Sequence, residues 1–526
     1  MSPASRHSVQ LVGLWAVVLG TALGVRPLLP VDETRYLAVA WEMWQRGDLL
    51  VPYLNGEPYS HKPPLLFWFI HLGWSVFGVN EWWPRLIAPL FSLANLYLTY
   101  AIARQLWPHE RETALAAPWV LFGGLLWAMF FTLLQFDLLL VFCSLLGIKG
   151  LANAVRGEAY GWLLLGLGLG LGALSKGPVV LVHLIPVALL APLWARQAGP
   201  DWGAWYAGVS VSLIIGALIA LAWAIPAARA GGDAYAQAIF WGQSAGRLVD
   251  AFAHRQPAWW YFAWLPVLLL PWVLWSVVWR GLRDPDLWKD EGTRMIISWI
   301  VPALLILSVI SGKQVKYLLP VLPGFALLIA RSLGFSLPTP GRLWAVAGML
   351  FAGGMTLLLL PALDSARLPF WASRIPWYWG LFSIGAAVLL LFFRPATAGE
   401  AVRRMAFGSA LLVMVTHLGL VHTAASAYDL EVVSQRIRHY QAAGKPVANV
   451  GKYHGQFQFL GRLAEPLVSV DAADAATWAR ANPDGYLVFY AGVSDIPTDG
   501  SELSQAYRTR PAGILIWQAS KFLMLE

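Results

Sequence analysis

The chain has 526 residues, of which 58% are apolar and only 13% are charged. Soluble proteins average about 45–50% apolar and about 25% charged residues, so this composition excludes an ordinary soluble globular protein. A single cysteine, Cys143, excludes a disulfide framework and a cysteine-based metal site. The net charge of +8 does not by itself indicate an anionic partner, because membrane proteins keep Lys and Arg in their cytoplasmic loops.

Apolar segments of about 20 residues, long enough to cross a bilayer as helices, recur along the chain. The first apolar run, residues 9–25, lacks a small-residue cleavage site and is predicted to be an anchor that is not cleaved. A cytoplasmic N-terminus places most basic residues of the short loops inside, which is the usual orientation. We predict about thirteen spans, near residues 9–25, 84–106, 113–132, 137–154, 160–175, 178–195, 204–226, 258–279, 294–311, 316–332, 343–361, 376–394 and 404–423.

Three outer segments, residues 26–83, 227–257 and 424–526, are too long to be simple connections. In the first, Thr34–Arg46 has helical spacing, with Tyr36, Val39, Ala40 and Met43 predicted on one face and Gly47 as the C-cap. After Lys62-Pro63-Pro64, the apolar stretch Leu65–Phe77 is too short to span upright and is predicted to be interfacial or re-entrant.

The last segment changes character, because short β-rich runs alternate there with polar helical stretches. The runs are Val447–Val450, Tyr486–Tyr490 and Ile514–Trp517. We therefore predict two domains: a transmembrane catalytic domain, residues 1–423, whose outer loops 26–83 and 227–257 cover the active site, and a periplasmic α/β domain, residues 424–526. The span at 160–175 carries Gly at alternate positions from 166 to 172, which favours close helix packing.

Asp32 and Glu33 follow the first span directly, at the outer membrane surface. Asp32 could cap the next helix, since its first turn favours negative charge. An ionisable group at the membrane face of a polytopic protein is equally a functional candidate. Arg35 and Tyr36, on the same helical turn, are suited either to an anion or to anchoring at the interface.

Lys62 precedes a predicted helix start at Pro63-Pro64, where the helix dipole disfavours a cation. A Lys and exposed N–H groups aimed the same way form an anion site, and the alternative is a Lys that extends to the membrane surface. Asp137, in an apolar run, is not expected to face lipid. Further outer polar residues are Lys176, Arg247, His254, Lys313, Lys316 and Tyr317, and together this set suits a lipid-linked phosphate.

The sequence contains no Walker A loop, no GxGxxG opening a helix, no GxSxG elbow and no HExxH spacing. Nucleotide cofactors and a serine hydrolase are therefore not supported.

A set of motifs resembles the lipid A aminoarabinose transferase family, within the GT-C superfamily that includes the protein O-mannosyltransferases. The resemblance covers residues 9 to about 332 best. The motifs occur in the family's order: Asp32-Glu33-Thr34-Arg35-Tyr36, Asn55-Gly56, Lys62-Pro63-Pro64-Leu65, Phe77-Gly78, Arg85, Gln135-Phe136-Asp137, Ser175-Lys176-Gly177-Pro178, His254, Pro257, Tyr261, Gly312-Lys313 and Tyr317-Leu318-Leu319-Pro320.

The resemblance implies a GT-C fold and sugar transfer from a polyprenyl phosphate donor. By position, Asp32 resembles the catalytic carboxylate and Asp137 a second, supporting acid. Lys62, Arg247 and Tyr317 resemble the donor-phosphate ligands. The remaining residues expected in the cavity are Arg35, Tyr36, His61, Lys176, His254, Lys313 and Lys316. Family members often have Glu where this chain has His61, which argues against the family's metal contact, so the sequence leaves two alternatives: no cofactor, or a divalent metal.

The sequence therefore predicts an inverting glycosyltransferase of the bacterial inner membrane, with a periplasmic C-terminal domain. Its expected partners are a polyprenyl (undecaprenyl) phosphate sugar, a lipid A or related surface-glycan acceptor, and membrane lipids, but no nucleic acid. The alternatives are a lipid-linked sugar flippase and an inactive assembly factor. Transporters tend to have internal repeats, which we do not find here, and the retained Asp32 and Lys62 argue against an inactive protein.

Overall fold

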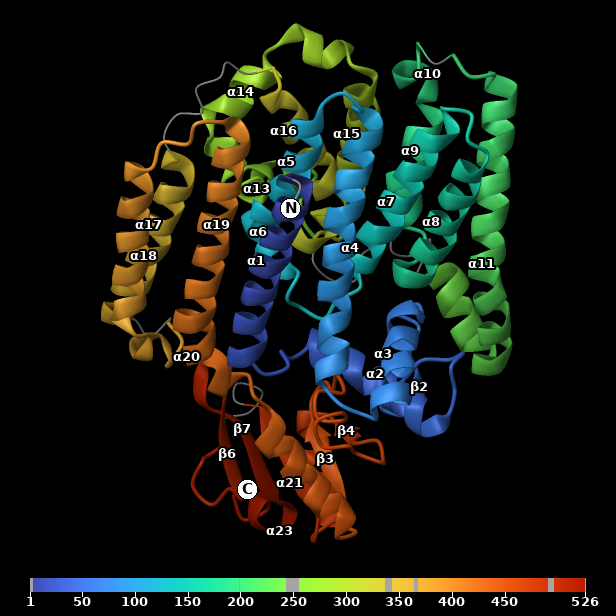
Figure 1. The fold of residues 1–526 in the computed structure, drawn as a ribbon. Coiled ribbons are helices and arrows are strands. Elements are labelled where there is room, and N and C mark those ends of the chain that lie inside the picture. The colour runs from blue at the N-terminus through green and yellow to red at the C-terminus, as the bar shows by residue number, and fades with distance from the viewer. Residues whose placement is uncertain are drawn as a thin grey trace. The chain divides into compact units, whose positions relative to one another are not determined.

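The computed structural model describes residues 3–197, 199–242, 255–335, 343–363, 368–490 and 496–525. The chain forms two compact units, each assembled from separate stretches of sequence. Unit 1 comprises residues 1–20, 60–353 and 382–414, and unit 2 comprises residues 21–59, 354–381 and 415–526. Figure 1 shows the elements of both, coloured along the chain.

Unit 1 is helical in its described part. Its helices are α3 (Leu65–Phe77), α4 (Trp82–Leu106), α5 (Arg111–Gly123), α6 (Leu125–Phe130), α7 (Asp137–Ala154), α8 (Tyr160–Lys176), α9 (Val180–Leu189), α10 (Ala191–Trp194), α11 (Trp202–Gln237), η1 (Ala238–Gly242), α13 (Trp260–Leu268), η2 (Trp272–Leu274), α14 (Ser276–Leu282), η3 (Pro285–Lys289), α15 (Glu291–Val309), η4 (Val315–Val321) and α16 (Leu322–Leu333). Both units share α1 (Pro3–Val25), α17 (Trp344–Leu359), α18 (Trp377–Phe392) and α19 (Ala398–Thr416).

Within the described residues, eight helical segments are long and apolar enough to cross a membrane. The chain is thus a multi-pass membrane protein, as predicted, while the number of thirteen spans stays a prediction. Three predicted spans are interrupted: 113–132 at Gly124, whose backbone is extended, 178–195 at Leu190, and 258–279 near Pro271. Proline lacks the N–H that an uninterrupted helix needs.

The glycines of α8 allow the close packing that their spacing predicts. A Cβ on Gly168 would lie 2.6 Å from the carbonyl oxygen of Cys143 in α7. On the other side, Cβ atoms on Gly166 and Gly170 would overlap Ile215 and Ile219 of α11. Figure 1 shows α8 beside both helices. Small residues let helix backbones approach closely in a membrane, where apolar burial contributes little to association.

Unit 2 contains α2 (Asp32–Arg46) and the short hairpin β1 (Tyr53–Leu54) and β2 (Glu57–Pro58). Its other elements are η5 (Leu360–Ala362), η6 (Ala372–Arg374), η7 (His417–Val421), α20 (His422–Ala424), η8 (Ala425–Ala427), α21 (Glu431–Ala442), β3 (Val447–Val450), β4 (Val468–Val470), η9 (Ala472–Asp474), α22 (Ala475–Ala481), β5 (Tyr486–Tyr490), β6 (Leu503–Tyr507), β7 (Arg510–Gln518) and α23 (Ala519–Phe522).

The C-terminal segment folds as the small α/β sheet that the sequence predicts. Its strand order is β4-β3-β5-β7-β6, with β4, β3 and β5 parallel and β7 antiparallel to both of its neighbours. The predicted runs 447–450 and 486–490 coincide with β3 and β5, and 514–517 lies within β7. Buried side chains such as Val450, Phe489 and Trp517 form the core. The two-domain division with boundaries 1–423 and 424–526 stays a prediction.

Helix α2 also follows its predicted pattern. Tyr36, Val39, Ala40 and Met43 are all buried. Gly47 ends the helix with φ of 65°, and its N–H donates to the carbonyl of Trp44 at 3.2 Å. This left-handed conformation costs least for Gly, so the C-cap that the sequence predicts is confirmed.

The Asn55-Gly56 turn joins the β1–β2 hairpin to the C-terminal α/β part of the same unit. Both residues have positive φ, which a tight two-residue hairpin favours. The Asn55 amide accepts from the N–H of Leu467 at 2.8 Å and donates to its carbonyl at 2.9 Å. Trp41 of α2 donates to the carbonyl of Leu463 at 3.0 Å. The family motif at Asn55-Gly56 therefore attaches the hairpin to the segment at Leu467 in this chain.

We predict that Asn55→Ala destabilises unit 2. It removes two hydrogen bonds, each worth about 0.5–1.5 kcal/mol, and places a Cβ residue without a polar side chain at positive φ. The thermal midpoint of the purified protein in detergent should fall, and proteolysis of the hairpin should become faster.

Asn55→Gly is the matched control, because it loses the same bonds without the backbone strain. An Asn55→Gly protein as stable as the wild type would contradict a stabilising role for the Leu467 contacts.

Candidate functional site

In unit 2, α2 carries the predicted catalytic carboxylate at its N-terminus. Asp32 is the first helical residue, and the cap position belongs to Val31, which makes no side-chain capping bond. The Asp32 carboxylate instead pairs with Arg35 at 2.5 Å, and 47% of its side chain is exposed. Its observed partner is thus a guanidinium one turn along the helix, and the carboxylate is still open to solvent.

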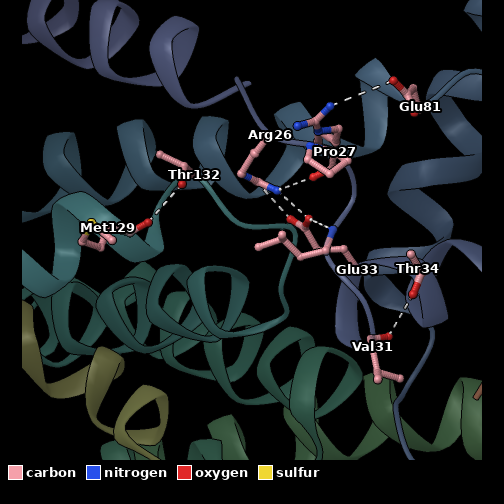
Figure 2. A network of polar contacts seen from close by, with 10 residues as sticks. Arg26, Pro27, Val31, Glu33, Thr34, Glu81, Met129 and Thr132 are labelled. Carbon is pink, nitrogen blue, oxygen red and sulfur yellow. Dashed lines mark hydrogen bonds and ion pairs between the residues drawn. The ribbon is translucent and has the colours of Figure 1, made fainter. Parts of the chain in front are cut away.

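The neighbouring acid, Glu33, is buried and paired. Arg26 approaches its carboxylate with two guanidinium nitrogens, at 2.5 Å and 3.1 Å, and Leu29 donates its N–H at 2.8 Å (Figure 2). Both charged side chains are almost fully buried. Such a bidentate pair fixes the chain where it enters α2. Glu33 therefore has a structural role, which leaves Asp32 as the accessible acid of the two.

The predicted cavity residues Arg35 and Tyr36 adopt different environments. Tyr36 is buried, whereas Arg35 is partly exposed, with its guanidinium carbon 5.7 Å from the centre of the Tyr36 ring. The same helix also buries Glu42, which accepts the N–H groups of Asn55 and Gly56 at 2.5 Å and 2.9 Å. Burial raises the pKa of the Glu42 carboxyl, and these two N–H groups oppose that shift.

In unit 1, predicted site residues gather around the start of α7. Lys62 lies just before α3, for which Pro64 is the cap residue. Its Nζ is 5.6 Å from the centre of the Phe136 ring, within the range of a cation–π contact. Phe136 directly precedes Asp137, the first residue of α7. The sequence analysis gave Phe136 no role, although the Gln-Phe-Asp motif contains it.

Asp137 forms a buried ion pair with Lys176, which ends α8. The Lys176 Nζ also lies 4.4 Å from the centre of the Tyr317 ring, so η4 joins the same group. Ser175 donates to the carbonyl of Phe136 at 3.3 Å and ties α8 to the start of α7. Asp137, Lys176 and Tyr317, predicted from distant parts of the sequence, are therefore brought together.

Lys313 is held differently from its neighbours in the same turn. Its ammonium group donates to the backbone carbonyls of Gln256 at 2.9 Å and Ile310 at 2.6 Å, and the residue is 3% exposed. Residues Arg255 and Gly312 form a β-bridge beside it. Lys313 thus links the segment at Gln256 to the turn after α15, and this contact gives it a structural role.

The remaining predicted site residues are less informative. His61 is exposed and Lys316 is partly exposed. Arg247 and His254 lie outside the described residues. Within the described part of the chain, no group of three His, Cys, Asp or Glu side chains could hold a metal ion. The described residues therefore do not offer a donor set for a divalent cation. The prediction about a cofactor stays a prediction.

Comparison with known proteins shows which proteins this chain resembles. A family described as dolichyl-phosphate-mannose-protein mannosyltransferase matches residues 61–225. The structure resembles ArnT from Cupriavidus metallidurans bound to undecaprenyl phosphate, with TM-score 0.77, 18% identity and 97% of both chains covered. It also resembles the apo state of that protein, with TM-score 0.78, 17% identity and 99% of both chains covered. The chain therefore has the fold of these two ArnT structures.

Several relatives are named undecaprenyl phosphate-alpha-4-amino-4-deoxy-L-arabinose arabinosyl transferase. The Serratia proteamaculans protein is 29% identical over 61% of this chain and 59% of its own length. The Pseudomonas paraeruginosa protein is 30% identical over 67% and 66%, respectively. A Pseudomonas fluorescens protein numbered 1 is 29% identical over 89% and 84%. The predicted resemblance is thus confirmed: the chain resembles ArnT in sequence and in fold. The first two matches span 59% and 66% of those relatives' lengths.

We predict that Asp137→Asn destabilises the protein by about 3–5 kcal/mol, because it leaves the buried Lys176 charge without its partner. The double variant Asp137→Asn, Lys176→Met should recover much of that loss, since it removes both charges. Thermal unfolding of the wild type, Asp137→Asn, Lys176→Met and the double variant in detergent measures this coupling.

Strictly additive losses in the double variant would contradict the ion pair. A stable double variant that no longer transfers sugar would show in addition that the pair of Asp137 and Lys176 serves the reaction.

Proposed function

We propose that this chain is an inverting glycosyltransferase. It moves a sugar from a polyprenyl (undecaprenyl) phosphate donor to lipid A or a related surface glycan. The observation that carries the proposal is the match over 89% of the chain to a relative whose name states the donor, undecaprenyl phosphate aminoarabinose, and the reaction, arabinosyl transfer. The grouping of Lys62, Asp137, Lys176 and Tyr317 around one helix start agrees with a site for an anionic lipid.

The proposed reaction is a substitution at the anomeric carbon of the donor sugar. An acceptor oxygen attacks the anomeric carbon, the bond from that carbon to the phosphate oxygen breaks, and the lipid phosphate leaves with the bonding electrons. Fixed cations stabilise the charge that develops on the leaving phosphate, usually the largest catalytic contribution. Lys62, Arg247 and Tyr317 are the proposed ligands of that phosphate. Asp137 orients Lys176 through their ion pair.

Asp32 is the proposed catalytic carboxylate. If the acceptor is a hydroxyl, Asp32 takes its proton as the new bond forms. If the acceptor is a phosphate, it is already ionised, and Asp32 orients it or balances positive charge on the sugar. Its exposure and its contact with the Arg35 guanidinium suit both versions.

The proposed location is the bacterial inner membrane, with a cytoplasmic N-terminus and a periplasmic C-terminal α/β part. The distribution of Lys and Arg among the short loops supports this orientation. The active site then faces the periplasm, where the acceptor glycans lie.

The choice of donor tests this function directly. We expect the purified protein in detergent to transfer aminoarabinose from undecaprenyl phosphate to lipid A, detected as a mass gain of one glycosyl unit. The lack of a nucleotide-binding motif predicts no turnover with a nucleotide sugar. Turnover with a nucleotide sugar in the absence of the lipid donor would overturn the proposal.

For Asp32→Asn we expect transfer to fall about 10²- to 10⁴-fold, the usual contribution of a positioned base. Stability should change little, because an exposed ion pair contributes only about 0–1 kcal/mol. Initial rates with lipid donor and the thermal midpoint measure the two effects separately.

Glu57→Gln is the matched control, since Glu57 is an exposed acid in the same unit. A well-folded Asp32→Asn protein with near wild-type transfer would return Asp32 to a structural role.

A further inference from the structure

The parallel part of the C-terminal sheet has the geometry of a ligand-binding edge. Strand β3 lies between β4 and β5, so the chain leaves β3 toward one side and later returns on the other. In open α/β sheets, ligands bind beyond the carboxyl ends of the strands at such a switch point. The loop Gly451–Gly455 begins at the carboxyl end of β3, and neither the mechanism above nor the family motifs use it.

A buried polar network holds this loop in place. Tyr490, at the end of β5, donates to the Asn449 side chain at 2.9 Å and accepts from Gln456. Asn449 in turn donates to the carbonyl of Gly451 at 2.9 Å, and Gln456 accepts the backbone N–H of His454 at 2.9 Å. Both ends of the loop are therefore anchored to the sheet, while the imidazole of the half-buried His454 takes no part in these bonds.

The same loop packs against α2 within unit 2. A Cβ on Gly455 would lie 2.5 Å from Leu54 and 3.0 Å from Ala38, and its φ is 74°. Only Gly fits such a close approach at positive φ. Ala38 lies one helical turn from Arg35, so His454, the residue before Gly455, is brought to the turn of α2 that carries Asp32 and Arg35.

The charges around His454 are mainly positive. Burial lowers the pKa of His454, and Arg35, Lys452 and Arg508 lower it further, whereas Asp32 acts in the opposite direction. The Asp32 carboxylate is already paired with Arg35. The cationic side chains of Arg35, Lys452 and Arg508 repel one another. A cluster of this kind favours a negatively charged ligand.

We propose that the loop Gly451–Gly455 binds a phosphate group of the acceptor, with His454 and Lys452 as its ligands beside Arg35. This inference rests on the proposed function, in which Lys62, Arg247 and Tyr317 hold the donor phosphate and no cationic ligand is assigned to the acceptor. The C-terminal α/β part thereby takes part in acceptor recognition.

Binding to the full-length protein in detergent tests this assignment. The probes are lipid A with both phosphates, chemically dephosphorylated lipid A, and undecaprenyl phosphate as a donor mimic. The wild type should bind phosphorylated lipid A at least about tenfold more tightly than the dephosphorylated form, the effect of one charge-assisted hydrogen bond. In His454→Gln and Lys452→Ala, that preference should shrink, and undecaprenyl phosphate should bind as before.

His439→Gln is the matched control, because His439 is an exposed histidine on α21 of the same α/β part. Unchanged lipid A binding in both variants would overturn the inference, and so would weaker binding of undecaprenyl phosphate alone, which would move the loop to the donor. Transfer by the wild type is assayed in parallel. Absent transfer with an intact phosphate preference would reject the proposed function and leave this binding site standing.

Discussion

A charge placed in or beside an apolar helical bundle must be paired, because desolvation of a lone ion costs far more than the fold can supply. Two buried pairs meet this constraint in the described structure. Arg26 and Glu33 lock the entry to α2, and Asp137 and Lys176 join the start of α7 to the end of α8. Each pair fixes the backbone beside a proposed functional side chain. Asp32 lies one residue before Glu33, and the ring of Tyr317 lies against Lys176, so both pairs lie directly beside these two side chains.

Helix α2 carries both buried structural residues and the exposed acid of unit 2. Its apolar face, with Val39 and Met43, is buried, while its first turn exposes Asp32. Along the same helix, Trp41 and Ala38 contact the C-terminal α/β part. A single helix thereby links the proposed catalytic carboxylate to the C-terminal sheet of the same unit.

Much of the fold could be predicted because hydrophobic periodicity is a local property. The apolar runs, the buried stripe of α2 and the strands β3 and β5 were all found from their own residues. The strands β4 and β6 were missed, because Val-Ser-Val and Leu-Ser-Gln-Ala-Tyr are short, partly polar edge strands that pairing partners define. Residue patterns gave the candidates Asp32, Lys62 and Asp137, and the resemblance gave each of them a role. Spacing could not show that Lys176 pairs with Asp137, since a contact across two helices has no signature within either.

The adjacent acids Asp32 and Glu33 show why residue type alone does not assign a role. In solution their carboxyl groups have nearly the same pKa, about 3.9 and 4.3. One step along a helix turns the side chain by about 100°, so neighbours face different surroundings. Glu33 turns toward Arg26 and forms a buried ion pair with it, while the Asp32 side chain is partly exposed beside Arg35. A fixed structural acid next to an accessible one lets the chain hold the proposed catalytic carboxylate in position without burying it, because the neighbour supplies the anchoring.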